Sequence, residues 1–201
     1  ISKYGETKVN NKKDIINKKN SIKINKKNYV LIQNEIDLKK WIIQAEEKGE
    51  LSIDTETTSL DPHQANLVGI SISLDIGKAG YIPIGHLKGK NFDENNVLRI
   101  LKPILEDPSI KKIGQNIKYD FIVLYHRGIL MNSLEDTMLM SYVLDAGKNR
   151  HNMDILSEIH LGHKTISFKD VVGSGKKQIN FNEVDIDIAK EYAAEDADIT
   201  F

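Results

Sequence analysis

Short apolar segments separated by turn residues predict the strands of this 201-residue chain. Each segment is rich in Ile, Val, Leu or Tyr and is bounded by Gly, Pro, Asn or Asp, which is typical of strands. The clearest of them, Leu51–Asp54, ends in a run of alternating Thr and acidic residues. The predicted strands are Tyr29–Gln33, Glu50–Asp54, Asn66–Leu74, Gly80–Ile84, Ile110–Gly114 and a short one at Ile129–Met131.

Longer segments repeat their apolar residues at helical spacing. In the first, Leu38, Trp41, Ile42 and Ala45 share one face, and Gly49 marks the end. Consecutive strands followed by alternating helices and strands predict an α/β fold, with a mixed β-sheet of about five strands flanked by helices. The predicted helices are Asp37–Lys48, Asp93–Glu106, Ile117–Arg127, Leu134–Leu144, Met153–Leu161 and Asp185–Phe201, and Lys164–Asn182 is predicted as a loop.

The charge distribution adds a boundary near residue 28. The formal net charge is −1, yet residues 1–28 are rich in Lys and Asn and poor in large apolar residues. This composition predicts a basic linker, or an arm that binds phosphate, before a domain at residues 29–201. The chain begins with Ile1 and stops at Phe201 inside a predicted helix, so we expect a piece of a longer polypeptide.

Two absences narrow the chemistry. The chain has no Cys, which excludes a disulfide framework, a thiolate metal site and a Cys nucleophile. No apolar run approaches the length of a membrane span, and no signal-peptide pattern opens the chain.

Two carboxylates at the end of a buried strand are candidates for metal binding. Asp54 and Glu56 alternate with Thr55, so both point to one side of the strand. Neighbouring acids repel each other and resist burial, and a shared Mg²⁺ or Mn²⁺ removes that cost. Taken alone, however, Asp-x-Glu is also compatible with a polar strand end that runs into a turn.

Two later pairs of residues could complete such a site. Asn116 and Asp120 are four residues apart on one face of a helix, where Asn116 is a plausible cap. Tyr192 and Asp196 are also four apart, on the last predicted helix. Each pair alone fits an ordinary capped or solvated helix. Two neighbouring acids, Glu195 and Asp198, are predicted to lie on the solvated face.

The other motifs in the chain are weaker indications of function. His160 and His163 are interrupted by Gly162, which disfavours a zinc site. The chain lacks a Gly-x-x-x-x-Gly-Lys-Ser/Thr loop and a nucleophile elbow, so a nucleotide triphosphatase and a serine hydrolase are disfavoured. Three further histidines are predicted in loops or at the surface: His63, His86 and His126.

Together, Asp54-x-Glu56, Asn116-x-x-x-Asp120 and Tyr192-x-x-x-Asp196 resemble the motifs of the DEDD superfamily of 3′–5′ exonucleases, tyrosine branch. From about Val30 to Phe201 the chain is similar to the proofreading domain of bacterial family A DNA polymerases. Segments that carry the resemblance include Asp54–Gly69, Leu101–Glu106, Gly114–Asp120, Asp136–Leu139, Arg150–Asp154, Lys164–Phe168 and Tyr192–Asp198.

The resemblance implies a ribonuclease-H-like fold and a phosphodiester hydrolase. It would act on the 3′ terminus of single-stranded or frayed primer DNA and release nucleoside 5′-monophosphates. The implied cofactors are two divalent ions, Mg²⁺ or Mn²⁺, with Zn²⁺ as an alternative at one site. Metal binding is implied for four acids, Asp54, Glu56, Asp120 and Asp196, with Asp120 acting through water, and Tyr192 would orient the attacking water.

Substrate contacts are implied for Thr57, Leu60, Gln115, Asn116, Tyr119, Arg150 and Phe168. For Leu60 and Phe168, a place in the core is the alternative. Further implications are a covalently linked polymerase domain, a preceding 5′-nuclease domain, no membrane, a monomer, and a bacterial cytoplasm close to the nucleoid during repair.

Two alternatives stay open. An RNA-trimming exonuclease similar to ribonuclease D shares the motifs, although Asn66–Gly69 and Lys164–Phe168 favour the polymerase type. A non-catalytic spacer that holds DNA is the other, and it is known where exonuclease domains have lost their carboxylates. All four carboxylates are present here.

Overall fold

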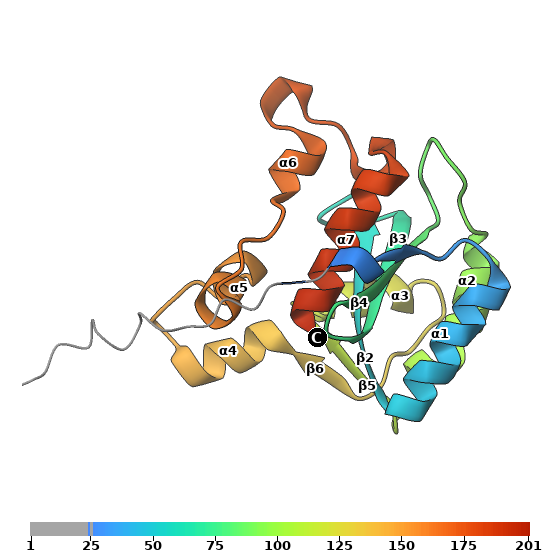
Figure 1. The fold of residues 1–201 in the computed structure, drawn as a ribbon, viewed down its shortest axis with the longest axis horizontal. Coiled ribbons are helices and arrows are strands. Elements are labelled where there is room, and N and C mark those ends of the chain that lie inside the picture. Colours follow the sequence, from blue (N-terminus) through green and yellow to red (C-terminus); the bar gives the residue numbers. More distant parts are fainter. Residues whose placement is uncertain (1–23, 25) are drawn as a thin grey trace, which may run out of the picture.

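The computed structural model describes residue 24 and residues 26–201, so the predicted linker at residues 1–28 lies almost wholly outside the described residues. Six strands form one mixed sheet in the order β1-β4-β3-β2-β5-β6 (Figure 1). Strand β2 pairs antiparallel with β3 and parallel with β5, which confirms the predicted α/β class. The strands are β1 (Val30–Leu31), β2 (Glu50–Thr57), β3 (Leu67–Asp75), β4 (Lys78–Pro83), β5 (Lys111–Gly114) and β6 (Leu134–Asp136).

Helices cover both faces of this sheet. Helix α7 packs on β2, β3 and β4, while α1 and α2 pack together on the other face. In Figure 1, α4, α5 and α6 lie on the side of the sheet away from α1 and α2. The helices are α1 (Glu35–Lys48), α2 (Glu94–Glu106), α3 (Lys118–Tyr125), α4 (Thr137–Asp145), α5 (Met153–Leu161), α6 (Phe168–Val172) and α7 (Ile186–Thr200).

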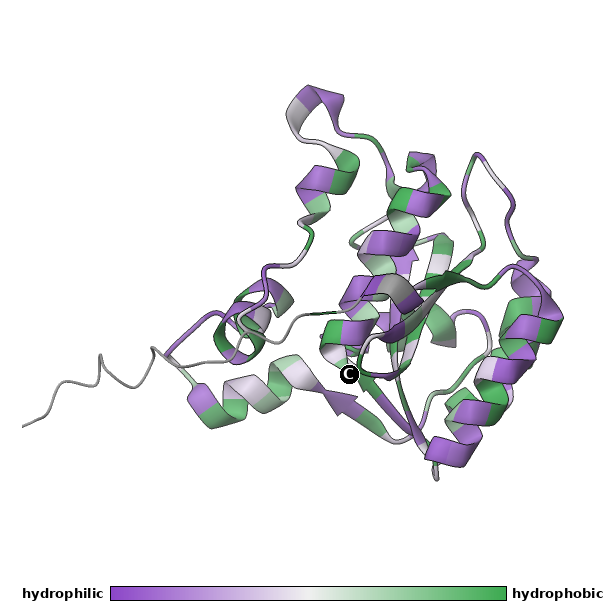
Figure 2. Ribbon diagram, in the orientation of Figure 1, coloured by the Kyte–Doolittle hydropathy of each residue, from purple (hydrophilic) through white to green (hydrophobic). Residues whose placement is uncertain are grey.

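The sheet therefore separates two apolar cores. On β4, Ile82 belongs to the core under α1 and α2, and its neighbour Tyr81 belongs to the core under α7. This alternation follows from the two-residue period of a strand. Helices α1 and α2 show alternating polar and apolar bands in Figure 2, as expected for helices with one face on a core.

Helix α1 forms as the sequence predicts. The Asn34 side chain accepts a hydrogen bond from the Asp37 amide at 2.9 Å, which satisfies a free donor of the first turn. Gly49 ends the helix at φ +74°, a conformation that glycine adopts without steric cost. The four predicted apolar positions of this helix are all buried.

The edge of the sheet differs from the prediction. Ile129 and Met131 are buried but form no strand, and the sixth strand is Leu134–Asp136, which was predicted as helix. The reason is local. The Asp136 carboxylate accepts hydrogen bonds from the backbone amides of Met138 and Leu139, so Asp136 caps α4 and the helix begins at Thr137 instead of Leu134.

The predicted loop at Lys164–Asn182 contains a helix. Ser167 caps α6 by accepting from the Asp170 amide at 3.3 Å, and two short 3₁₀ turns follow at Gly175–Lys177 and Phe181–Glu183. A five-residue helix is too short to show the apolar period that identifies longer ones. Among the described residues, no helix has the length and apolar character needed to cross a membrane.

Candidate active site

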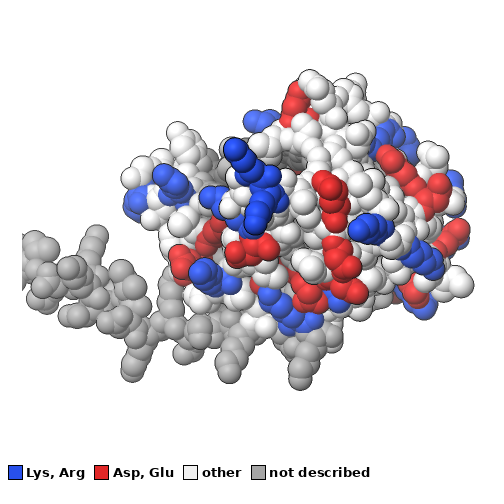
Figure 3. All heavy atoms as spheres, turned by 90° about the horizontal axis from the view of Figure 1, so that it is seen from above, with Lys and Arg blue, Asp and Glu red and all other residues white. Residues whose placement is uncertain are grey.

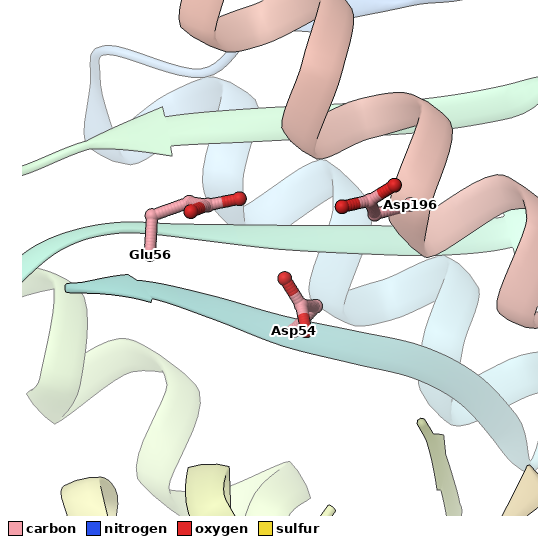
Figure 4. A group of neighbouring side chains, drawn as sticks. All are labelled: Asp54, Glu56 and Asp196. Carbon is pink, nitrogen blue, oxygen red and sulfur yellow. The ribbon is translucent and has the colours of Figure 1, made fainter. Parts of the chain in front are cut away.

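Three carboxylates meet between β2 and α7. Asp54 and Glu56 come from β2 and Asp196 from α7, and one oxygen of each lies within 4.8 Å of the others. Figure 4 shows the three side chains pointing toward one another. The helix is held close to the strand at this point, since the Ser52 hydroxyl donates to the Ala197 carbonyl at 2.6 Å. This set of hard oxygen ligands suits a divalent cation.

Asp120 lies beside this group, on α3. Its Oδ1 accepts from the backbone amide of Thr55 at 2.9 Å and from the Thr55 hydroxyl at 2.5 Å. Strand β5 pairs with β2 only as far as Ser52, so the aspartate takes the place of a neighbouring strand. Asp120 therefore lines the same cleft as the three carboxylates but approaches from the other side of β2.

The electrostatics of the cluster are unfavourable without a cation. Burial and the charge of Asp196 raise the pKa of Asp54 to about 8. Burial also raises the pKa of Asp196 to about 8. The pKa values of Glu56 and Asp120 are raised too, by burial first and by the neighbouring carboxylates second. Bound cations would reverse this penalty, so the residues present fit a metal site.

Tyr192 completes the inner part of the site. It lines the cleft one helical turn before Asp196, and its hydroxyl works against the rise in the pKa of Asp196. Burial and the surrounding carboxylates raise the pKa of Tyr192 itself above its usual range, so it stays a donor. The spacing of Tyr192 and Asp196 thus places a neutral hydroxyl directly beside the carboxylate cluster.

An open cleft of about 1070 Å³ surrounds the cluster. All predicted site residues line it except Arg150, which is exposed and lies outside the lining. The structure therefore brings together the following predicted residues: Asp54, Glu56, Thr57, Leu60, Gln115, Asn116, Tyr119, Asp120, Phe168, Tyr192 and Asp196.

Leu60 and Phe168 form apolar parts of the cleft. Leu60 is 97% exposed, so a place in the core is wrong for it. Phe168 is 43% exposed, its ring stacks on Phe181 with centroids 6.1 Å apart, and it meets Tyr192 edge-on at 6.0 Å. One side of its ring thus packs on the protein while the residue remains accessible from the cleft.

Hydrogen bonds of backbone and side-chain groups stabilise the wall of the cleft beside α3. The Tyr119 hydroxyl donates to the Ser59 carbonyl and contacts the Thr57 hydroxyl, which fixes the loop that carries Leu60. Asn116 does not cap α3 with its side chain, contrary to the prediction. Asn116 adopts φ +57° just before the helix, and its backbone amide donates a hydrogen bond to Asp136 Oδ1 at 3.0 Å.

The prediction for two acidic residues of α7 is wrong. Glu195 and Asp198 are not solvated but buried, at 0% and 7% exposure. Asp198 accepts from the Tyr29 hydroxyl and the Gly77 amide, each at 2.7 Å. The alanines of α7 could have indicated this burial, because other elements can pack on several sides of a helix that carries many small residues.

The three histidines predicted in loops or at the surface divide into two groups. His63 and His126 are exposed, as predicted, and their ring nitrogens lie 2.9 Å apart. His86 is buried, contrary to the prediction, because its ring bridges the Tyr81 hydroxyl at 2.7 Å and the Val184 carbonyl at 3.0 Å. The sequence also missed Asp154 as a residue of the cleft, where it accepts from the Thr165 hydroxyl at 2.7 Å.

A family model described as 3′–5′ exonuclease matches residues 29–201. The chain belongs to this 3′–5′ exonuclease family. DNA polymerase I of Rhizobium leguminosarum is 46% identical to the exonuclease domain over 192 residues, a match that covers 86% of this chain and 19% of the polymerase. The exonuclease domain thus spans about a fifth of that relative, and it is the kind of 3′–5′ exonuclease that DNA polymerase I contains.

Solved structures agree on the fold of the exonuclease domain. Escherichia coli RNase D superposes with a TM-score of 0.66 at 20% identity, over 86% of this chain and 42% of its own. Brucella melitensis NrnC, in a structure with bound Mg²⁺, superposes with a TM-score of 0.58 at 25% identity, over 88% of this chain and 71% of its own. The ribonuclease-H-like architecture predicted from the sequence is confirmed.

Proposed function

We propose that this exonuclease domain removes the 3′-terminal nucleotide of single-stranded or frayed primer DNA as a nucleoside 5′-monophosphate, and so proofreads for a DNA polymerase. The observation that carries the proposal is the meeting of Asp54, Glu56 and Asp196 in an open cleft. The 46% identity to a DNA polymerase I supports DNA as the substrate. In this proposal the covalent partners are a polymerase domain and a 5′-nuclease domain, in a monomer of the bacterial cytoplasm near the nucleoid.

The cofactors in this proposal are two divalent cations, Mg²⁺ or Mn²⁺, with Zn²⁺ as an alternative at one site. Asp54, Glu56 and Asp196 would hold them directly, and Asp120 would reach them through water, since its Oδ1 is already bonded to Thr55. When bound, such ions act as Lewis acids that activate water and stabilise the leaving oxygen. The Mg²⁺ in the related NrnC structure supports this choice of metal.

The protein's own groups would orient the reaction. The Tyr192 hydroxyl, next to Asp196, would position the attacking water, because a neutral phenol can accept one hydrogen bond while it donates another. Leu60 would act as an apolar wedge at the terminal base of a frayed end, and Phe168 would stack on a base without regard to sequence. Thr57, Gln115, Asn116 and Tyr119 line the cleft where sugar and phosphate would lie, and Arg150 would reach them from outside.

A digestion assay tests this function. Single-stranded DNA and RNA of one sequence, labelled at the 5′ end, are each incubated with the domain and Mg²⁺ or with EDTA. We expect shortening from the 3′ end that needs metal and is faster for DNA. Faster RNA digestion would instead support an RNA-trimming enzyme, as the fold shared with an exoribonuclease allows.

Substitution of the central carboxylate separates an enzyme from a spacer. Asp54→Ala should lower the digestion rate by at least about a hundredfold, the usual cost of losing one preorganised electrostatic group. Glu50→Ala, which removes an acid at the far end of the same strand, is the matched control and should leave the rate unchanged. Circular dichroism checks that both variants are folded, and the absence of metal-dependent digestion by all three proteins would support a non-catalytic spacer.

A further inference from the structure

Glu195 is a fully buried carboxylate next to Asp196, on a different face of α7. Its Oε1 accepts from Lys26 Nζ at 2.6 Å and from His163 Nε2 at 2.9 Å, and its Oε2 accepts from the Ile166 amide at 2.6 Å. Burial of a carboxylate is costly unless it is hydrogen-bonded and paired, and these donors meet that need. Two of the three donors belong to one segment, the connection from α5 to α6.

This connection leads directly into the wall of the cleft. Helix α6 begins at Phe168, two residues after Ile166, and Phe168 carries the aromatic face described above. Directly before Ile166, the Thr165 hydroxyl donates a hydrogen bond to Asp154, another residue of the cleft. The bonds to Glu195 therefore tie the segment before Phe168 to the helix that carries Tyr192 and Asp196.

We propose that Glu195 is a positioning residue for substrate binding, because it fixes Phe168 where a nucleotide base would stack. The role rests on the proposed function, in which Phe168 is the stacking aromatic. Glu195 itself neither joins the carboxylate cluster nor lines the cleft. Loss of a hydrogen bond between Glu195 and the α5–α6 connection should therefore weaken the binding of the DNA strand and leave the metal-dependent chemical step intact.

Two substitutions separate this role from plain stability. His163→Ala removes a donor of the α5–α6 connection, while Lys26→Met removes a donor to the same Oε1 from a segment that does not lead to Phe168. We expect His163→Ala to raise KM for a 3′-ended single strand about fivefold or more, the weaker end of base–aromatic stacking. Its kcat should change little, and Lys26→Met should keep both constants near those of the wild type.

A double-mutant cycle with Phe168→Ala tests whether the effect passes through the ring. If Glu195 acts by placing Phe168, His163→Ala should add nothing to KM once the ring is gone. Amide hydrogen exchange of the segment from His163 to Phe168 should be faster in His163→Ala and unchanged in Lys26→Met.

The outcomes are distinct. Additive effects on KM, or equal effects of His163→Ala and Lys26→Met, would overturn the positioning role and leave Glu195 a purely structural residue. A wild-type KM in His163→Ala would do the same while the proposed function stands. A wild-type domain that fails to digest the strand with Mg²⁺ would overturn the proposed function and this role with it.

Discussion

Leu60 is the residue whose exposure most affects its interpretation. A leucine on a turn after a buried strand fits either a core position or a contact with the substrate, and the sequence leaves both open. Its side chain is 97% exposed at the cleft, in a loop that Tyr119 fixes through the Ser59 carbonyl. An apolar side chain held in that place contributes little to the fold, so its role is testable without loss of structure.

Leu60→Ala should leave the free energy of unfolding within about 0.5 kcal/mol of the wild type, because surface substitutions rarely cost more. The same change should lower the rate on a frayed duplex end more than on a single strand, since a wedge matters most where two strands must be separated. Urea unfolding and digestion of the two substrates measure these effects. An equal loss of rate on both substrates would contradict the wedge role.

At the scale of elements, strand β3 is matched closely to β4. Gly69 pairs with Pro83, and an added Cβ at Gly69 would lie 2.1 Å from the Tyr81 hydroxyl. Tyr81 cannot move aside easily, because it is fully buried and its hydroxyl is bonded to His86 at 2.7 Å. The position of the Tyr81 ring over β3 therefore depends on the missing side chain at Gly69.

Gly69→Ala should destabilise the domain by about 1–3 kcal/mol, the usual cost of overpacking a core. Ser71→Ala on the same strand is the control, because the buried Ser71 hydroxyl has no hydrogen-bond partner among the described residues. Its removal should be neutral or slightly stabilising. The urea midpoints of both variants measure these changes in stability. A Gly69→Ala protein as stable as the wild type would show that the Tyr81 ring can move aside.

The elements also show how far the sequence predicts the structure. The central strands and the helix at α1 follow from apolar periods, because each is long enough to show its repeat. Strand β6 does not, since it has three residues and ends in Asp136, the cap of the next helix. The carboxylates of the cluster are identified by the resemblance of their motifs to those of known exonucleases, but the burial of Glu195 depends on donors from His163 and Ile166, which no local pattern reveals.

At the scale of the whole molecule, the charges outside the cleft are mixed. Lys, Arg, Asp and Glu are interspersed on the face shown in Figure 3, and the formal net charge is only −1. Long-range attraction of a polyanion is therefore weak, so in the proposed function the affinity comes from the cleft and from cations bound there. The concentration of raised pKa values at Asp54, Glu56, Asp120 and Asp196 then sets how stability responds to pH and metal.

Without divalent metal, the domain should lose stability as pH rises from about 4 to about 8. In this window the folded protein keeps protons on Asp54 and Asp196, whose pKa values are about 8, while the unfolded chain has released them. The unfolded state then binds fewer protons, so the free energy of unfolding falls as pH rises. Urea unfolding in EDTA at pH 5 and pH 8 measures the fall.

Asp54→Asn is the decisive comparison for this effect. It removes one of the mutually repelling charges, so its loss of stability between pH 5 and pH 8 should be smaller than in the wild type, and at pH 8 the variant should be the more stable protein. Mg²⁺ added at pH 8 should stabilise the wild type more than the variant, because a ligand that binds only the folded state adds its binding free energy. Equal pH dependence in both proteins, together with equal stabilisation by Mg²⁺, would contradict this account. It would mean that the carboxylates of the cluster neither repel one another in the folded protein nor bind the cation.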